Sequence, residues 1–194
     1  MAVMIIMEVD GFGKDTYDRV NEEMGIRSAD DLPEGCIAHA AGPTDSGFLV
    51  VDVWESPEAF GRFAESRLGP AAGKLGLPQL TPRMIPVHNR IHSGAGSASG
   101  AIVLIETPLT PEQYDDLTAR MPAHVADGSG HPAVSHTAGV EDGRIVVVDI
   151  WGSPEEFERF LGEQIAPAAG ELPPMEPRIV PAHNHLRPSA RTTA

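Results

Sequence analysis

The sequence predicts an α+β fold made of two tandem β-α-β-β-α-β units that are packed sheet to sheet. The main observation is an internal repeat, because residues 48–73, FLVVDVWESPEAFGRFAESRLGPAAG, return at residues 145–170 as IVVVDIWGSPEEFERFLGEQIAPAAG. Roughly half of the aligned positions are identical, as expected for a duplication. Each copy reads as a β-branched strand that runs into a capped helix, and a Gly/Ser-rich stretch, HSGAGSASG, separates the two halves.

The first half is predicted to contain four strands and two helices. Apolar runs bounded by turn residues predict the strands, and the apolar residues of the first helix follow the helical spacing of one buried face. Ser56 is placed to cap the second helix, which Gly69 and Pro70 are expected to end. The predicted strands cover residues 3–9, 35–41, 48–54 and 82–91, and the predicted helices cover residues 14–26 and 57–68.

The second half repeats this order. Trp54 and Trp151 are separated by 97 residues, as are Tyr17 and Tyr114. Thr110 is placed to cap the first helix of this half, and Gln113 stands at the position that completes a capping box. We therefore expect repeat 1 over residues 1–92, a linker over 93–100, repeat 2 over 101–187 and a disordered tail over 188–194.

The order of elements is the ferredoxin-like split βαβ arrangement, with helices on one face of an antiparallel sheet. A tryptophan that closes the third strand and the SPEAF start of the next helix resemble the dimeric α+β barrel superfamily, in particular its antibiotic-biosynthesis-monooxygenase-like (ABM) branch. The resemblance implies that this chain is a fused dimer, that is, an internal pseudo-dimer; a further homodimer is left open. It also implies a ligand pocket between the sheet and the helices of one unit.

Composition excludes several classes of partner. The formal net charge of −14 argues against nucleic acid and anionic membranes. No apolar run approaches the ~20 residues that cross a bilayer. Cys36 is the single cysteine, so no disulfide forms within the chain and a reducing cytoplasm is the expected location. A small-molecule ligand remains as the expected partner.

Asp52 and Trp54 form the first candidate pair. Alternate residues of a strand share a face, so the two side chains point the same way, and Trp151 repeats the arrangement in the second half. Because an unpaired buried carboxylate is costly, Asp52 is expected to bond to a histidine, and His39 and His88 are the candidates.

Such a pair can orient an imidazole as a general base, and His136 and His183 are the candidates in the second half. The alternative is structural: Asp52 is a satisfied core carboxylate and Trp54 is a core residue.

A repeated His-Asn dipeptide on the fourth strand is the second candidate constellation. His88 or His39 can move protons, and Asn89, with Asn184 in the second half, can hold an oxyanion. Strand-end capping is the alternative for this dipeptide. Trp54 is assigned to ligand binding as a stacking wall. Four further residues are assigned to ligand binding: Arg83, Arg90, Tyr17 and Trp151.

No metal and no cofactor are expected. His183 and His185 share a strand face, which is the beginning of a metal site, but Arg90 stands in place of the second histidine in the first half. The sequence contains no HExxH, P-loop or dinucleotide fingerprint.

The resemblance implies a cofactor-independent monooxygenase that acts on a small aromatic or polyketide-like molecule. The chemistry of the residues themselves assigns the catalytic roles to His88, His39, Asp52 and Asn89. The alternatives are a non-catalytic small-molecule-binding or stress-response protein and a polyketide-cyclase-like enzyme. Since Arg90 follows the first His-Asn pair, we expect the first half to carry the chemistry with His88 as base, and the second half to be weaker.

Overall fold

The computed structural model describes residues 1–92, 100–170 and 172–188, and it separates into two compact units. Unit 1 contains Met1–Met84 and the chain from His183 on, and unit 2 contains Ile85–Ala182. The predicted linker, apart from residue 100, and the predicted tail, apart from residue 188, lie outside the described residues. The sheet-to-sheet packing of the two halves stays a prediction.

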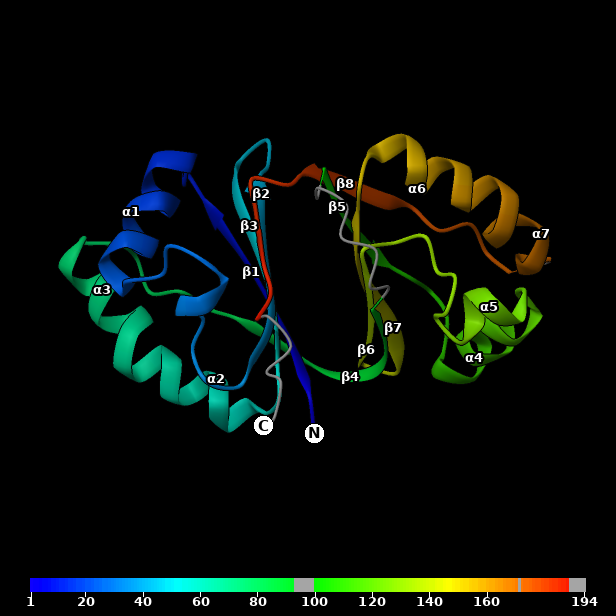
Figure 1. The fold of residues 1–194 in the computed structure, drawn as a ribbon, viewed down its shortest axis with the longest axis horizontal. Coiled ribbons are helices and arrows are strands. Elements are labelled where there is room, and N and C mark those ends of the chain that lie inside the picture. The colour runs from blue at the N-terminus through cyan, green and yellow to red at the C-terminus, as the bar shows by residue number, and fades with distance from the viewer. Residues whose placement is uncertain (93–99, 171, 189–194) are drawn as a thin grey trace. The chain divides into compact units, whose positions relative to one another are not determined.

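Unit 1 is an antiparallel sheet with helices on one face (Figure 1). The strand order is β1-β3-β2-β9, so the first strand pairs with the third as a split βαβ arrangement requires. The strands are β1 (Val3–Asp10), β2 (Cys36–Pro43), β3 (Gly47–Trp54) and β9 (Asn184–Leu186), and the helical segments are α1 (Lys14–Met24), η1 (Ala29–Asp31), α2 (Pro57–Phe63), η2 (Ala64–Leu68) and α3 (Gly69–Lys74).

The second helix of unit 1 begins as predicted but does not end at Pro70. The hydroxyl of Ser56 accepts a hydrogen bond from the backbone N–H of Ala59, which caps α2. The helix then passes through the π-helical turn η2 and continues as α3, with Pro70 in its first turn. A π turn moves the preceding carbonyl groups away from the proline ring, so the expected stop was wrong for a geometric reason. Unit 2 repeats this feature around Pro167.

Unit 2 is a second antiparallel sheet, with the strand order β8-β5-β7-β6-β4. The predicted capping box of Thr110 and Gln113 is present at the start of α4. The strands are β4 (Arg83–His92), β5 (Ala101–Glu106), β6 (Ser135–Glu141), β7 (Arg144–Trp151) and β8 (Pro177–Pro181), and the helical segments are α4 (Pro111–Arg120), α5 (Ala123–Ala126), α6 (Pro154–Phe160), η3 (Leu161–Ile165) and α7 (Ala166–Ala169).

The compact units do not coincide with the sequence repeats, because the end of each fourth strand belongs to the other unit. From Ile85 on, β4 is part of unit 2, where residues 87–92 pair with β6. In repeat 2, β8 pairs with β5 of its own unit, whereas β9 pairs with β2 of unit 1. In repeat 2 the change of partner follows Pro181, and proline cannot donate to a continuous ladder. The predicted repeats 1–92 and 101–187 stay a description of the sequence, and the compact units are Met1–Met84 with the chain from His183 on, and Ile85–Ala182.

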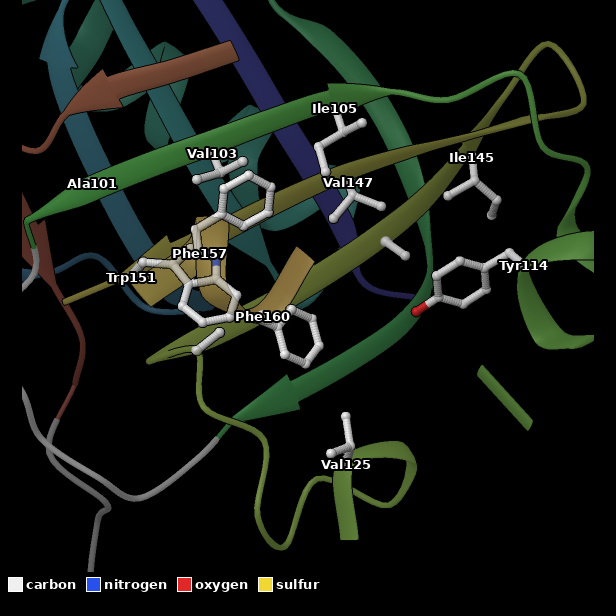
Figure 2. Packing of buried hydrophobic residues seen from close by; sticks show 12 residues of the cluster. Ala101, Val103, Ile105, Tyr114, Val125, Ile145, Val147, Trp151, Phe157 and Phe160 are labelled. Atoms are coloured by element: carbon white, nitrogen blue, oxygen red, sulfur yellow. The ribbon is translucent and has the colours of Figure 1, made fainter. Parts of the chain in front are cut away.

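Each unit has its own apolar core between sheet and helices. In unit 2 the cluster gathers around Trp151, which is 0% exposed, with Phe157 and Phe160 of α6 against its ring (Figure 2). Trp54 holds the same place in unit 1, against Phe60 and Phe63. Both tryptophans are therefore core residues, as the structural alternative expected. No helix among the described residues combines the length and the apolar character needed to span a bilayer.

Candidate functional site

Each unit contains a cavity between its sheet and its helices. The unit 1 cavity has a volume of about 70 Å³ and is lined mainly by apolar side chains from β1, β3, α1 and the end of α2. The unit 2 cavity has a volume of about 60 Å³ and is lined by the corresponding elements. The π-helical turns contribute Leu68 to the first cavity and Leu161 to the second. Each is large enough for a few water molecules or a small ligand.

A tyrosine, a histidine and an aspartate form a chain of hydrogen bonds on the wall of the unit 1 cavity. His39 and Asp52 are cross-strand partners of β2 and β3, and His39 Nδ1 lies 2.7 Å from Asp52 Oδ1. The Tyr17 hydroxyl, from α1, lies 2.5 Å from His39 Nε2. Since the carboxylate can only accept, His39 donates from Nδ1, and Nε2 then accepts from the Tyr17 hydroxyl. The three side chains form a relay from phenol to imidazole to carboxylate.

The His-Asn dipeptide of repeat 2 completes this relay in unit 1. Asn184 Nδ2 donates to the Tyr17 hydroxyl oxygen at 2.9 Å. His183 Nε2 lies 2.9 Å from Asp18 Oδ1, beside Tyr17 on α1, and its ring contacts Tyr17 edge to face. The asparagine therefore adds a fourth member to the chain of hydrogen bonds, while the half-buried histidine bonds to Asp18 outside it.

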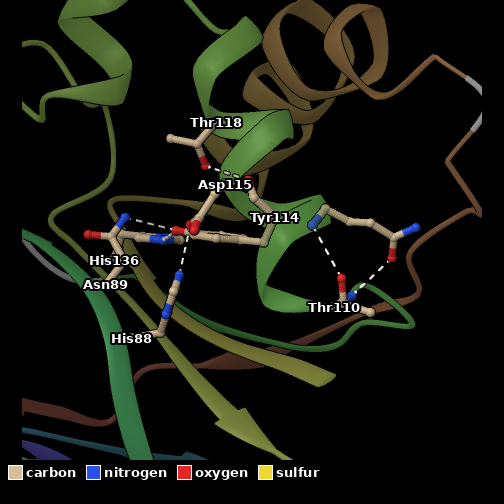
Figure 3. A network of polar contacts seen from close by, with 8 residues as sticks. His88, Asn89, Thr110, Tyr114, Asp115, Thr118 and His136 are labelled. Atoms are coloured by element: carbon tan, nitrogen blue, oxygen red, sulfur yellow. Dashed lines mark hydrogen bonds and ion pairs between the residues drawn. The ribbon is translucent and has the colours of Figure 1, made fainter. Parts of the chain in front are cut away.

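Unit 2 repeats the geometry with the dipeptide of repeat 1 (Figure 3). Tyr114 lies 2.7 Å from His136 Nε2, and His136 Nδ1 lies 2.7 Å from Asp149 Oδ1. Asn89 Nδ2 donates to the Tyr114 hydroxyl at 3.0 Å, and His88 Nε2 lies 2.7 Å from Asp115 Oδ1. Two independent copies with the same four-residue chain indicate that the arrangement is a built feature of the fold.

Burial controls the protonation of the two tyrosines. It raises the pKa of Tyr17 to about 12, while the hydrogen bond from Asn184 acts in the opposite direction. Burial likewise raises the pKa of Tyr114 to about 12, against the hydrogen bond from Asn89. Both phenols are therefore neutral at ordinary pH, so each can pass a proton along the relay without resting as a phenolate.

Spectrophotometric titration tests this environment, because the chain has two tyrosines and both belong to the relays. We expect tyrosinate absorbance of the native protein to develop near pH 12, and that of the unfolded protein near pH 10. A raised pKa in the folded state stabilises the fold fully below about pH 10, and this stabilisation is lost as pH rises toward 12. Tyr17→Phe should halve the amplitude. Native titration near pH 10 would contradict the buried relay.

Several predicted site residues lie at these cavities. His39, Asp52, Trp54 and Tyr17 line the unit 1 cavity. His136 lines the unit 2 cavity. Trp151 is fully buried beside it and is not among its lining residues.

Three placements differ from the prediction. His88 and Asn89 complete the site of unit 2 rather than that of unit 1, because the fourth strands are exchanged. Arg90 is an exposed residue of unit 2, and neither Arg90 nor Arg83 is among the residues that line the two cavities. The expected grouping of His88 and Arg90 with His39 in one pocket was therefore wrong.

No prediction from the sequence had indicated the central position of the two tyrosines or the role of the aspartate that follows each of them. Asp18 and Asp115 directly follow the tyrosines and hold the dipeptide histidines, which the repeat offset could have indicated. His131 also lines the unit 2 cavity without any counterpart in unit 1. Among the described residues, no group of three or more His, Cys, Asp or Glu side chains is arranged to hold a metal ion.

Comparison with solved structures establishes the fold. No family model and no curated protein matches the sequence. A candidate monooxygenase from Lactobacillus acidophilus NCFM matches with a TM-score of 0.70 at 9% identity, covering 96% of this chain and 96% of that one. A ferredoxin-fold protein related to antibiotic biosynthesis monooxygenases, from Listeria monocytogenes, matches with a TM-score of 0.50 at 10% identity over 95% and 96% of the two chains.

An anthrone oxidase-like protein matches with a TM-score of 0.51 at 15% identity, covering 96% of this chain and 93% of that chain. These matches extend over both units, so the predicted resemblance to ABM-like proteins as a tandem ferredoxin-like fold is confirmed at the level of fold. At such low identity they say nothing of the reaction.

Proposed function

We propose that this protein is a cofactor-independent monooxygenase that oxidises a small aromatic or polyketide-like molecule in the cavity between sheet and helices. The observation that carries the proposal is the Tyr–His–Asp relay on the wall of an apolar cavity, present in both units. Oxygen chemistry without a cofactor requires a substrate that becomes electron-rich when it loses a proton, so the protein must supply a base in a dry pocket.

In unit 1 the base is His39, acting through Tyr17. The Tyr17 oxygen accepts a proton from the substrate while its own proton passes to His39 Nε2, over the observed 2.5 Å contact. Asp52 stabilises the imidazolium that forms, because its carboxylate accepts the hydrogen bond from Nδ1 at 2.7 Å. Asn184 donates to the Tyr17 oxygen and stabilises the negative charge that develops there during the transfer.

The deprotonated substrate then reacts with O₂. For an anthrone, which the matched anthrone oxidase-like protein suggests as a probe, the methylene carbon loses a proton and the resulting anion transfers electrons to O₂. A carbon–oxygen bond forms, and one anthrone and one O₂ give one anthraquinone and one water. The apolar cavity walls exclude solvent, which protects the anion from reprotonation.

Oxygen uptake with anthrone and with hydroquinones as substrates tests the proposal. We expect catalysed consumption of one O₂ per anthrone, above the rate of spontaneous oxidation, and anthraquinone as the product. The matched control is the protein in which both relay tyrosines are phenylalanine. Uptake that is no faster than this control for every substrate would contradict the proposed oxidase.

Deuterium exchange under anaerobic conditions separates the proton-transfer step from the oxygen step. A cyclase-like enzyme would exchange the methylene protons of anthrone in D₂O without oxidising it in air. A binding protein would do neither, and the observation that favours this second candidate is that each relay is fully hydrogen-bonded within the protein. Ligand binding without exchange or oxygen uptake would therefore place the binding protein ahead.

A further inference from the structure

A groove lies in unit 1 next to the cavity of the relay. It has a volume of about 390 Å³ and lies between helix α3 and residues 75–82, which lead from that helix to β4. A volume of ~300–1,000 Å³ is usual for a ligand pocket. The residues that line the groove include Leu68, Ala72, Gly73, Leu77, Pro78 and Leu80. None of the described residues on its walls carries a charge, so the groove favours an apolar ligand.

The end of α3 determines the shape of the groove. Gly76 adopts a left-handed conformation with φ of 66°, where it reverses the chain at the end of the helix. The N–H groups of Gly76 and Leu77 donate to the carbonyl oxygens of Gly73 and Ala72, at 3.1 Å and 3.0 Å. This pair of hydrogen bonds is the Schellman motif, which holds the loop against the helix. The groove is therefore formed by backbone hydrogen bonds and exists without a ligand.

Repeat 1 is longer than repeat 2 at the groove. The offset between the repeats falls from 97 residues at Pro70 to 95 residues at Pro82, so repeat 1 has two extra residues between these points. This segment contains the end of α3 and the loop that together form the groove. The groove therefore belongs to a part of the duplicated chain in which the two halves differ.

The groove adjoins the relay cavity. Met7, Leu68 and Leu80 line both spaces. Leu68 and Leu80 are half-buried and pack against the apolar core of unit 1. Leu68 comes from the π turn η2, and such turns are frequent at functional sites. A ligand in the groove can therefore reach the relay cavity past three apolar side chains.

The size of the relay cavity decides which ligand can occupy both spaces. The cavity has a volume of about 70 Å³, whereas an apolar cavity of about 150 Å³ holds one benzene ring. A ring can enter the relay cavity only if its walls move, but an unbranched methylene chain is narrower than a ring. The polar atoms of the relay are already hydrogen-bonded to one another, so we expect the end of the chain that enters the cavity to be apolar.

We propose that unit 1 binds a ligand with an unbranched aliphatic chain, which lies in the groove and extends its methyl end past Leu68 into the relay cavity. Burial of the methylene groups against the apolar walls supplies the affinity. The polar end of the ligand stays at the open side of the groove, in contact with solvent. The site goes beyond the proposed function, because it requires neither proton transfer nor oxygen.

Binding of straight-chain and cyclic alcohols tests the site in the intact protein. The primary alcohols from 1-butanol to 1-octanol differ only in chain length, and cyclooctanol closes the same number of carbon atoms as 1-octanol into a ring. The chain has two tryptophans, one in each unit, and their indole N–H signals in ¹⁵N–¹H NMR report the two units in one sample. Trp54 lines the relay cavity, and Trp54→Phe assigns the signals.

We expect the affinity reported by the Trp54 signal to rise about fourfold for each added CH₂ group, which is the effect of burying one methylene. 1-Octanol should bind at least about tenfold more tightly than cyclooctanol, because the ring buries fewer methylene groups in the two spaces. The Trp151 signal should show no such dependence on chain length, and it serves as the internal control.

Gly73→Leu and Gly61→Leu are the matched variants. Both glycines lie in helices, and a Cβ atom added at either one meets nothing within 4 Å. Gly73 lines the groove, whereas Gly61 is not among the residues that line the groove or the relay cavity. Gly73→Leu fills the groove and should weaken binding of 1-octanol about tenfold or more, while Gly61→Leu should bind it as the wild-type protein does. Leu77→Asp, which places a carboxylate on the wall of the loop, should give a similar loss.

Equal affinities for 1-octanol and cyclooctanol, no increase in affinity with chain length, or unchanged binding in both Gly73→Leu and Leu77→Asp would each overturn the chain site. Calorimetric binding of 1-octanol without a shift of the Trp54 signal would also overturn it, because the chain would then not reach the relay cavity. If Gly73→Leu does not fold, Leu77→Asp and the wild-type alcohol series decide the question. Chain binding together with failed anthrone oxidation would retain the chain site and reject the oxidase, and the reverse result would retain the oxidase alone.

Discussion

Replacing both relay tyrosines, Tyr17 and Tyr114, by phenylalanine is expected to lower turnover by about 10²- to 10⁴-fold, which is the usual contribution of a positioned general base or acid. The phenylalanine ring keeps the packing of each tyrosine but removes the oxygen through which the substrate proton passes. His39 and His136 would then keep their carboxylate partners without reaching the substrate. Initial rates of oxygen uptake with anthrone give the ratio directly.

The single variants divide the activity between the two units. If both relays act, Tyr17→Phe and Tyr114→Phe should each remove part of the rate, and the double variant should remove nearly all of it. Asn184→Ala and Asn89→Ala serve as graded controls, since each removes one hydrogen bond to a tyrosine and leaves the relay itself intact. Full activity in the double variant would exclude the relay from the mechanism.

Trp151→Ala is expected to destabilise the protein by about 3–5 kcal/mol, the range for truncating a large buried aromatic residue. Trp151 is 0% exposed and packs against Phe157 and Phe160 at ring-centroid distances of 5.6 Å and 5.2 Å. Its indole nitrogen has no hydrogen-bond partner among residues 1–92, 100–170 and 172–188, so the expected loss comes from packing. Urea unfolding followed by circular dichroism measures it, because the substitution removes a fluorophore.

Trp54→Ala is the matched comparison. Trp54 occupies the same repeat position, but it also lines the unit 1 cavity. Truncation next to existing free space should therefore destabilise less than Trp151→Ala, and ligand binding to unit 1 should weaken. A loss below about 0.5 kcal/mol for Trp151→Ala would contradict its place in the core, as that is the level expected of a surface substitution.

Within each half, the sequence pattern predicted the local elements well, because each depends on residues that are close along the chain. The strand ending at Trp54, the cap at Ser56 and the capping box at Thr110 lie where the residues predict them. The helix stop at Pro70 was the exception. A proline normally ends a helix, and only the π turn before it, which no local signal announces, allowed the helix to continue.

The same distinction between local and tertiary interactions applies to the candidate site. From the sequence, His39 was one of two candidate partners of Asp52, and the hairpin register of β2 and β3 in the structure places these two residues opposite each other. Tyr17 could be placed only on the inner face of a helix, since side chains on different elements meet through packing. The hydrogen bond between Tyr17 and His39 is therefore a result of the tertiary structure.

By itself, the sequence determined that this protein is a duplicated α+β chain, with the same tyrosine, histidine, aspartate and asparagine in each copy, because a repeat and its periodicity are properties of the chain alone. Only the tertiary structure decided which asparagine donates a hydrogen bond to which tyrosine hydroxyl. A strand edge offers backbone groups that pair with any suitable strand, so the sequence of β9 does not state its partner. In the folded protein Asn184 reaches Tyr17 and Asn89 reaches Tyr114, and each site is completed by the other repeat.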